Sequence, residues 1–164
     1  GNADVVVRKI VHSAATFEAD MLCLVAVGDE GQVAIPLFQW FRDAETSADV
    51  IPDSLINRWL PRLRHGLTID EQFPEKTEST ALYGPVAIRS ALVLPLMLEG
   101  VLAGFFCVCH SREAKVWRNV EKYMMEIEAS GISMALHLAP GLLHAVKKSG
   151  LTTSLLAHKV FPPV

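Results

Sequence analysis

Residues 88–111 read IRSALVLPLMLEGVLAGFFCVCHS, and this stretch decides the fold. Two apolar runs, 90–98 and 101–110, flank the pair Glu99-Gly100. Both runs are rich in Val, Leu and Phe, which favour strands, and a glycine between two such runs is typical of a tight turn. We therefore predict two buried strands that form a hairpin.

The same stretch is long enough to cross a bilayer if it were a helix, so a membrane span is the alternative. Pro95 and the Glu99-Gly100 pair lie inside it. A charge near the bilayer centre costs about 2.5–3.5 kcal/mol on insertion scales. We therefore predict no membrane association.

The residues before this hairpin predict a helix followed by a first hairpin. Apolar residues at helical spacing over 4–18 indicate the helix. The run 21–27 and the run 32–41 are separated by Gly28-Asp29-Glu30-Gly31, a turn signal. Pro36 in the second run indicates an edge strand or a β-bulge.

A second helix is predicted from Pro52, because proline is common in the first turn of a helix. Pro61 should kink it or end it early, and Gly66 fits the position after its end. The polar stretch 68–86 is expected to be a long surface crossover with one helical turn over 79–83.

A long helix is predicted over 116–139, and it has two apolar faces. One stripe alternates in steps of three and four, which is typical of a helix that pairs with another helix: Trp117, Val120, Met124, Ile127, Gly131, Met134 and Leu138. A second stripe is expected to face the sheet: Tyr123, Ile132 and Ala135. Pro140-Gly141 ends the helix, and 140–164 forms a helical tail or linker.

This order of elements predicts an α+β fold with an antiparallel sheet, the N- and C-terminal helices on one face and a pocket covered by a loop and a helix on the other. At 164 residues the chain is one domain. The net charge of −3 argues against a nucleic-acid partner. Three cysteines do not suit a secreted disulfide framework, so a cytoplasmic location is expected.

The sequence resembles the GAF domain of bacterial signalling proteins. The resemblance rests on Arg89, Ser90, Pro95, Leu96, Gly100 and Gly104, and upstream on Ile56-Asn57-Arg58-Trp59-Leu60 and Arg62-Leu63-Arg64-His65-Gly66. It implies a small-molecule sensor domain over 4–139, with 140–164 leading to a possible output domain. The apolar stripes over 6–17 and 117–138 predict a homodimer formed by the N- and C-terminal helices.

The ligand-level patterns of the family are missing. The Asn-Lys-x-x-x-Phe-x-x-x-Asp-Glu signature of cyclic-nucleotide binders is not present, and residues 42–89 contain no Cys to attach a bilin. No metal, haem or bilin is therefore predicted, and the ligand stays unknown.

Cys107-Val108-Cys109-His110 is the strongest candidate for chemistry. In a strand the two cysteines point to one face and the histidine to the other, so the three do not converge on a metal. Small buried apolar residues are one interpretation. A redox-sensing thiol pair, with Cys23 as a third member, is the other.

The predicted ligand cavity lies at the middle of the sheet, under the segment 42–89. Its expected lining is Phe38, Trp40, Trp59, Leu63, Arg89, Ser90 and Leu92. Three functions stay open: a dimeric ligand-sensing module without catalytic activity, a small thiol-based redox enzyme using Cys107 and Cys109, and a ligand-free dimerisation module.

Overall fold

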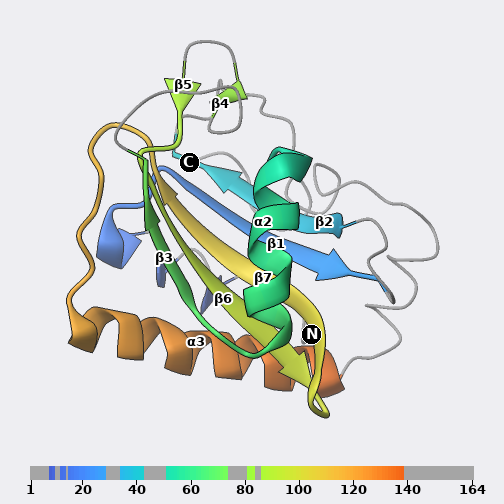
Figure 1. Ribbon diagram of the computed structural model, residues 1–164. Coiled ribbons are helices and arrows are strands. Elements are labelled where there is room, and N and C mark those ends of the chain that lie inside the picture. Colours follow the sequence, from blue (N-terminus) through green and yellow to red (C-terminus); the bar gives the residue numbers. More distant parts are fainter. Residues whose placement is uncertain are drawn as a thin grey trace.

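The computed structural model describes residues 8–9, 12–13, 15–28, 34–42, 51–73, 81–83 and 86–138. Five of its strands form one antiparallel sheet in the order β2-β1-β7-β6-β3 (Figure 1). These strands are β1 (Met21–Val27), β2 (Ala34–Phe41), β3 (Ile69–Gln72), β6 (Ser90–Leu98) and β7 (Val101–His110). The antiparallel α+β architecture predicted from the sequence is confirmed.

Both predicted hairpins are present. Glu99 and Gly100 form the turn between β6 and β7, and both have positive φ angles, 52° and 78°. β2 lies at the edge of the sheet, and the β1–β2 register shifts between Leu24 and Val25, opposite Pro36. Pro36 thus lies in an edge strand and beside an irregularity, as its missing N–H predicts.

The prediction for residues 68–86 is wrong. β3 pairs with β6 from Ile69↔Val93 to Gln72↔Ser90 and forms the second edge of the sheet. Within the range 79–83, where a helical turn was expected, the described residues form a strand instead: β4 (Ala81–Tyr83) pairs with β5 (Val86–Ala87) in a small separate sheet.

Helix α2 (Asp53–Arg64) packs on one face of the sheet. Pro61 lies inside this helix, so the alternative that it ends the helix early is wrong. The helix ends at Arg64, with His65 as its C-cap. Gly66 follows, as predicted, with a φ of 75°, the left-handed conformation that glycine adopts without strain. The apolar core below α2 includes Leu55, Trp59, Leu63, Val93, Phe105 and the three cysteines.

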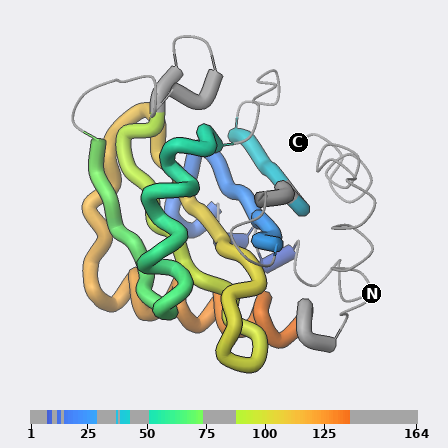
Figure 2. The backbone as a smooth tube through the Cα atoms, turned by 45° about the vertical axis from the view of Figure 1, so that its right-hand side comes forward, coloured from blue at the N-terminus to red at the C-terminus, as the bar shows by residue number. Residues whose placement is uncertain are grey.

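Helix α3 (Asn119–Leu138) packs on the opposite face (Figures 1 and 2). Its buried residues Met125, Ala129 and Ile132 contact a second core that contains Leu22, Leu92, Leu94 and Phe106. Phe17 packs against the same core, and Nζ of Lys9 lies 3.8 Å from Oε2 of Glu128 in α3. The described N-terminal residues therefore share a face with α3, as predicted; the tail 140–164 lies outside the described residues.

The two faces of α3 differ in detail from the prediction. Ile132 contacts the sheet core, but Tyr123, expected beside it, is 64% exposed. Trp117, expected in the outer stripe, is buried against the core. The helix therefore presents Met125, Ala129 and Ile132 to the sheet. No helix among the described residues is long and apolar enough to cross a membrane.

Candidate functional site

The predicted ligand residues lie on opposite faces of the sheet. Trp59 and Leu63 are fully buried in the core below α2, whereas Leu92 is buried in the core below α3 and Trp40 packs against that second core. The prediction that these four side chains line one cavity is wrong. Successive side chains of a strand alternate in direction, so an error of one position moves a residue to the other face.

Trp59 has a structural position under α2. Its ring lies 6.4 Å from that of Phe105 in an edge-to-face arrangement. Its indole Nε1 donates a hydrogen bond of 2.8 Å to Oε1 of Glu71, and Arg58 pairs with the other oxygen of the same carboxylate. These contacts join α2 to β3 and leave the indole face occupied by protein.

Ser90 and Arg89 also differ from the predicted roles. The fully buried Ser90 Oγ accepts a 2.8 Å hydrogen bond from the backbone N–H of Lys115, so it fixes the segment that leads into α3. Arg89 is exposed, and its backbone bonds to His110 and Phe73 continue the sheet. The side chain of Phe38 lies outside the described residues.

A groove of about 690 Å³ lies on the α3 side of the molecule. It exists because β3 begins only at Ile69, opposite Val93, while β6 continues for five more residues. Its walls are the turn after α2, the end of β6 and the C-terminal half of α3. It is lined by Gly66, Leu67, Thr68, Leu94, Pro95, Met97, Leu98, Glu99, Glu126, Ala129, Ser130, Ser133 and Met134.

The groove is amphipathic. Leu67 and Met134 are 52% and 62% exposed, so its walls offer apolar surface. Glu126 and Glu99 supply its charged groups, and Glu126 accepts a hydrogen bond of 3.1 Å from Thr68 Oγ1. A volume between about 300 and 1,000 Å³ is usual for small-molecule sites. No pattern in the sequence indicates this groove, because the groove depends on where β3 starts.

The outer side of α3 carries a row of exposed apolar side chains, called here the α3 stripe: Val120, Tyr123, Met124, Ile127 and Met134. Each of them is at least 47% exposed. Exposed apolar rows on a helix are typical of interaction surfaces. Four of the five were predicted to pair with another helix.

Three thiols lie together below α2. Cys23 is directly opposite Cys107 in the β1–β7 register, and the Sγ atoms of Cys107 and Cys109 are 3.4 Å apart. All three residues are buried. Burial, together with the neighbouring thiols, raises the pKa of Cys107 well above its ordinary value. A thiol in this state is a weak nucleophile. No cluster able to hold a metal occurs within the described ranges.

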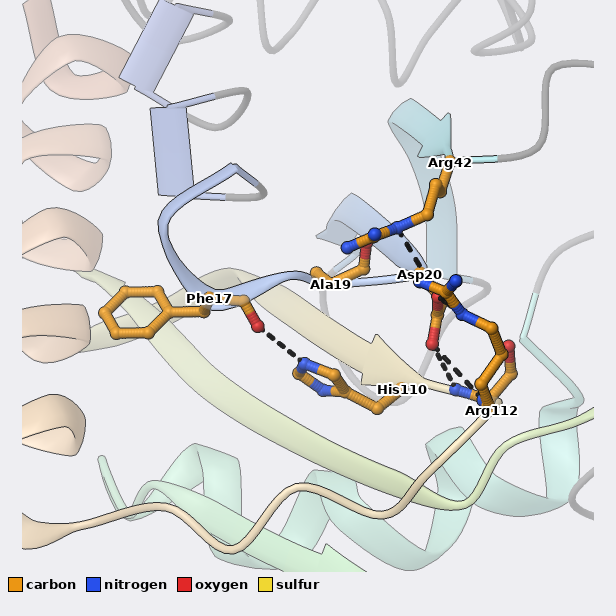
Figure 3. Close-up of polar contacts among 7 residues, drawn as sticks. Phe17, Ala19, Asp20, Arg42, His110 and Arg112 are labelled. Atoms are coloured by element: carbon orange, nitrogen blue, oxygen red, sulfur yellow. Dashed lines mark hydrogen bonds and ion pairs between the residues drawn. The ribbon is translucent and has the colours of Figure 1, made fainter.

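A polar network closes the end of the sheet where β1 starts (Figure 3). Asp20 accepts hydrogen bonds from the backbone N–H groups of Ser111 and Arg112 and pairs with the side chain of Arg112. Nε of Arg42 lies 3.5 Å from the same carboxylate. Although burial raises its pKa, the backbone N–H groups of Ser111 and Arg112 and the guanidinium of Arg112 leave the pKa of Asp20 below the usual value.

No protein-family model matches the chain, and no curated protein matches it. Solved structures do. One is the blue-light absorbing form of the PixJ GAF domain of Thermosynechococcus elongatus, which is 15% identical with a TM-score of 0.64 over 89% of this chain and 91% of that chain. The chain has a GAF fold. This agrees with the resemblance in its sequence.

Two further GAF domains match over most of their length. One belongs to the phosphoenolpyruvate-protein phosphotransferase of Acinetobacter, at 12% identity and a TM-score of 0.63 over 86% of this chain and 85% of that one. The other is the second GAF domain of DevS from Mycobacterium smegmatis, at 20% identity and a TM-score of 0.60 over 88% of this chain and 99% of that one. At these identities the likeness establishes the GAF fold.

Proposed function

We propose that this GAF domain is a regulatory module that works as a homodimer and responds to a small molecule. The observation that carries the proposal is the α3 stripe. One side of α3 is packed on the sheet, and the other presents five apolar side chains to solvent. A second copy of the helix would bury these side chains.

A second copy suits this surface because α3 spans 20 residues and its exposed apolar positions follow helical spacing. Val120, Met124, Ile127 and Met134 are separated by four, three and seven residues, as in the seam of paired helices. The described N-terminal residues lie on the same side of the sheet. Both predicted dimerisation elements are therefore available to one interface, from which a signal could pass to an attached output domain.

The groove beside α3 is the position we propose for the ligand. Its apolar walls favour an organic body, and Glu99 and Glu126 favour a cationic or hydrogen-bond-donating group at either rim. Met134 belongs both to the groove and to the α3 stripe. A ligand in the groove would therefore act directly beside the proposed interface. Arg89, which was predicted from the sequence as a ligand contact, is exposed but does not line this groove.

The redox alternative is disfavoured by the surroundings of the thiols. The three cysteines are buried in an apolar core, and the pKa of Cys107 is raised rather than lowered. Catalytic thiols need the opposite shift. The ligand-free dimerisation module differs from our proposal only in ligand binding.

Two measurements test the proposal. Sedimentation of the wild-type chain is expected to give a dimer, and a monomer at high concentration would contradict it. Thermal unfolding with purines, cyclic nucleotides, amino acids, small acids and small amines tests ligand binding; at one hundred times its Kd a ligand stabilises the fold by about 2.7 kcal/mol.

A variant of the groove separates the possible binding positions. Ser133→Trp fills the groove and should abolish the stabilisation by an active compound, whereas Asn57→Trp on the exposed side of α2 should leave it intact. If no compound stabilises the wild type, the ligand-free dimerisation module is the better interpretation.

A further inference from the structure

His110 connects three segments that are far apart in the sequence. It is the last residue of β7 and only 6% exposed. Its ring contacts Phe17, at the end of the described N-terminal helical residues, and Trp117, just before α3. The rings of Phe17 and Trp117 are themselves 5.1 Å apart. The imidazole therefore lies where β7 meets both segments that pack on one face of the sheet.

The hydrogen bond to Phe17 fixes the tautomer of the neutral ring. Nε2 of His110 lies 2.9 Å from the backbone carbonyl oxygen of Phe17 (Figure 3). A carbonyl oxygen only accepts, so Nε2 must carry the proton. In the neutral ring Nδ1 is then an unprotonated acceptor. This atom is buried and has no hydrogen-bond partner among the described residues.

Charged side chains near the His110 ring lie on each of the segments that pack against it, and they act on its protonation in opposite directions. Two groups favour the protonated ring: the Phe17 carbonyl, which accepts from Nε2, and the carboxylate of Asp20, before β1. The carboxylate of Asp20 is already held by Ser111, Arg112 and Arg42. Arg42, after β2, and Lys115, before α3, disfavour the protonated ring. Glu121 of α3 is paired with Lys115 and with Arg118, and the carboxylate of Glu18 is exposed.

Lys115 is held close to this ring cluster. Its Nζ lies 4.8 Å from the centre of the Trp117 ring and 5.8 Å from that of Phe17, and 3.0 Å from Oε2 of Glu121. A second positive charge on His110 would thus face a cation that is fixed in place. It would also place a new N–H at Nδ1, in a buried position without an acceptor from the described residues.

We propose that His110 is a pH-sensitive latch: its neutral ring ties the end of the N-terminal helical residues to β7 and to the entry of α3, and protonation of the ring releases this contact. The unpartnered Nδ1 and the fixed Lys115 oppose protonation in place. Rotation of the charged ring toward water removes both conflicts, and it breaks the bond to Phe17 and the contact with Trp117. The latch is a property of the single chain and does not depend on a dimer or a ligand.

The sign of the pH effect follows from the environment. Burial is the main cause that lowers the pKa of His110 below its ordinary value of 6.5. The fold therefore gains stability from the neutral ring above pH 6.5 and loses it as the pH falls below 6.5 toward the pKa of the folded state. The loss in the folding equilibrium constant is about tenfold for each unit by which folding lowers the pKa.

The experiment uses the full chain and two variants. Urea unfolding between pH 7.5 and pH 5 is compared for the wild type, His110→Gln and His65→Gln. Glutamine can donate to the Phe17 carbonyl but does not titrate, so His110→Gln should lose less stability than the wild type on acidification. His65 is exposed at the end of α2, so His65→Gln should follow the wild type. Equal acid losses in the wild type and His110→Gln would overturn the latch.

Two measurements on the wild type keep the proposal testable if His110→Gln fails to fold. The nitrogen chemical shifts of the imidazole should report a single Nε2–H tautomer at pH 7.5, and an Nδ1–H tautomer would overturn the proposal. Hydrogen exchange of the Phe17–Met21 amides, corrected for the chemical rate, should accelerate between pH 7.5 and pH 5. Exchange in Ile56–Leu60 of α2 is the internal control. Unchanged protection at Phe17–Met21 would mean that protonation releases nothing.

Discussion

The indole Nε1 of Trp59 donates a hydrogen bond to Oε1 of Glu71, and this bond joins the middle of α2 to the edge strand β3. Trp59 is fully buried, whereas Glu71 keeps part of its surface in water. The second oxygen of Glu71 pairs with Arg58, which also lies over the ring of Phe73. One carboxylate therefore fixes both a buried donor and an exposed cation.

Glu71→Ala should destabilise the fold by about 1–3 kcal/mol, because it leaves the buried Trp59 N–H without its acceptor. Arg58→Ala removes only a partly exposed ion pair, with the Arg58 side chain 49% exposed, and should cost about 1 kcal/mol or less. Urea unfolding of the two variants measures the difference. Equal losses would mean that the indole bond contributes nothing beyond the ion pair.

Gly104→Ala should be strongly destabilising. A Cβ atom at this position would collide with the backbone carbonyl of Val25 in the neighbouring strand β1, which cannot move without distorting the sheet. Overpacking of this kind costs about 1–3 kcal/mol or more. Circular dichroism and thermal unfolding measure the effect.

Gly131→Ala is the matched control for that variant. Among the residues that the structure describes, the atoms nearest to its Cβ belong to the flexible side chain of Lys9, with Nζ at 3.3 Å. Alanine is also the better helix former, so a gain of about 0.5–1 kcal/mol is expected. If both alanine variants were equally unstable, the close contact between β7 and β1 would not explain the first result.

Glu121→Gln should reduce stability at neutral pH and by a smaller amount at pH 3.5, where part of the contribution of the carboxylate has been lost. Its carboxylate accepts from the backbone N–H of Arg118 and pairs with Lys115, which lowers its pKa from 4.5 to about 2. A lowered pKa gives stability above pH 4.5 that is lost as the pH falls toward 2. Hydrogen bonds to charged groups contribute about 1.5–3 kcal/mol. Unfolding free energies at pH 7 and pH 3.5 test this, and a loss that does not depend on pH would contradict it.

The three thiols should be unreactive in the folded chain. All are buried, and the pKa of Cys107 is raised by burial and by the neighbouring Cys109 and Cys23. Titration with a thiol reagent at pH 7.5 should detect none within minutes, and three after denaturation. A thiol that reacts rapidly in the native chain would favour the alternative of a thiol-based redox enzyme.

Met124→Glu combined with Met134→Glu should convert dimers into monomers, because two charges would be buried in each half of the proposed interface. Both side chains are exposed in the single chain, so its folding should be unaffected. Asn57→Glu, on the exposed side of α2, is the control that keeps the dimer. Sedimentation velocity distinguishes the two variants. A doubly charged variant that remains dimeric would place the interface elsewhere.

The elements that were predicted correctly are those whose local chemistry leaves few alternatives. Apolar runs separated by turn residues define both hairpins, and Pro36 and Gly66 mark a bulge and a helix end. β3 was missed because its sequence, Ile69-Asp70-Glu71-Gln72, has a single apolar residue. Only the pairing with β6 makes it a strand, and pairing is not a local property.

The site was harder to predict than the fold because it depends on which side of a strand each residue occupies. Ser90 and Leu92 alternate with Ala91 and Val93, and nothing local in the sequence says which pair faces α2. Trp59 and Leu63 were placed on the correct element, but their side chains fill the space where a cavity was expected. His110 was assigned correctly to the face opposite Cys107 and Cys109, yet its bond to Phe17 joins residues 93 positions apart.

The pairing of β1 with β7 has a consequence for how the chain folds. It joins the two hairpins into one sheet. The pairing of Cys23 with Cys107 cannot form until Cys107, 84 residues later in the chain, has been synthesised. Until then β1 has only β2 beside it, although all seven of its residues are buried in the finished domain. Such distant pairings slow folding, and strands left open during synthesis promote aggregation. The emerging chain therefore exposes the apolar β1–β2 hairpin until β7 has been made, and expression at low temperature or with a chaperone should raise the yield of folded protein.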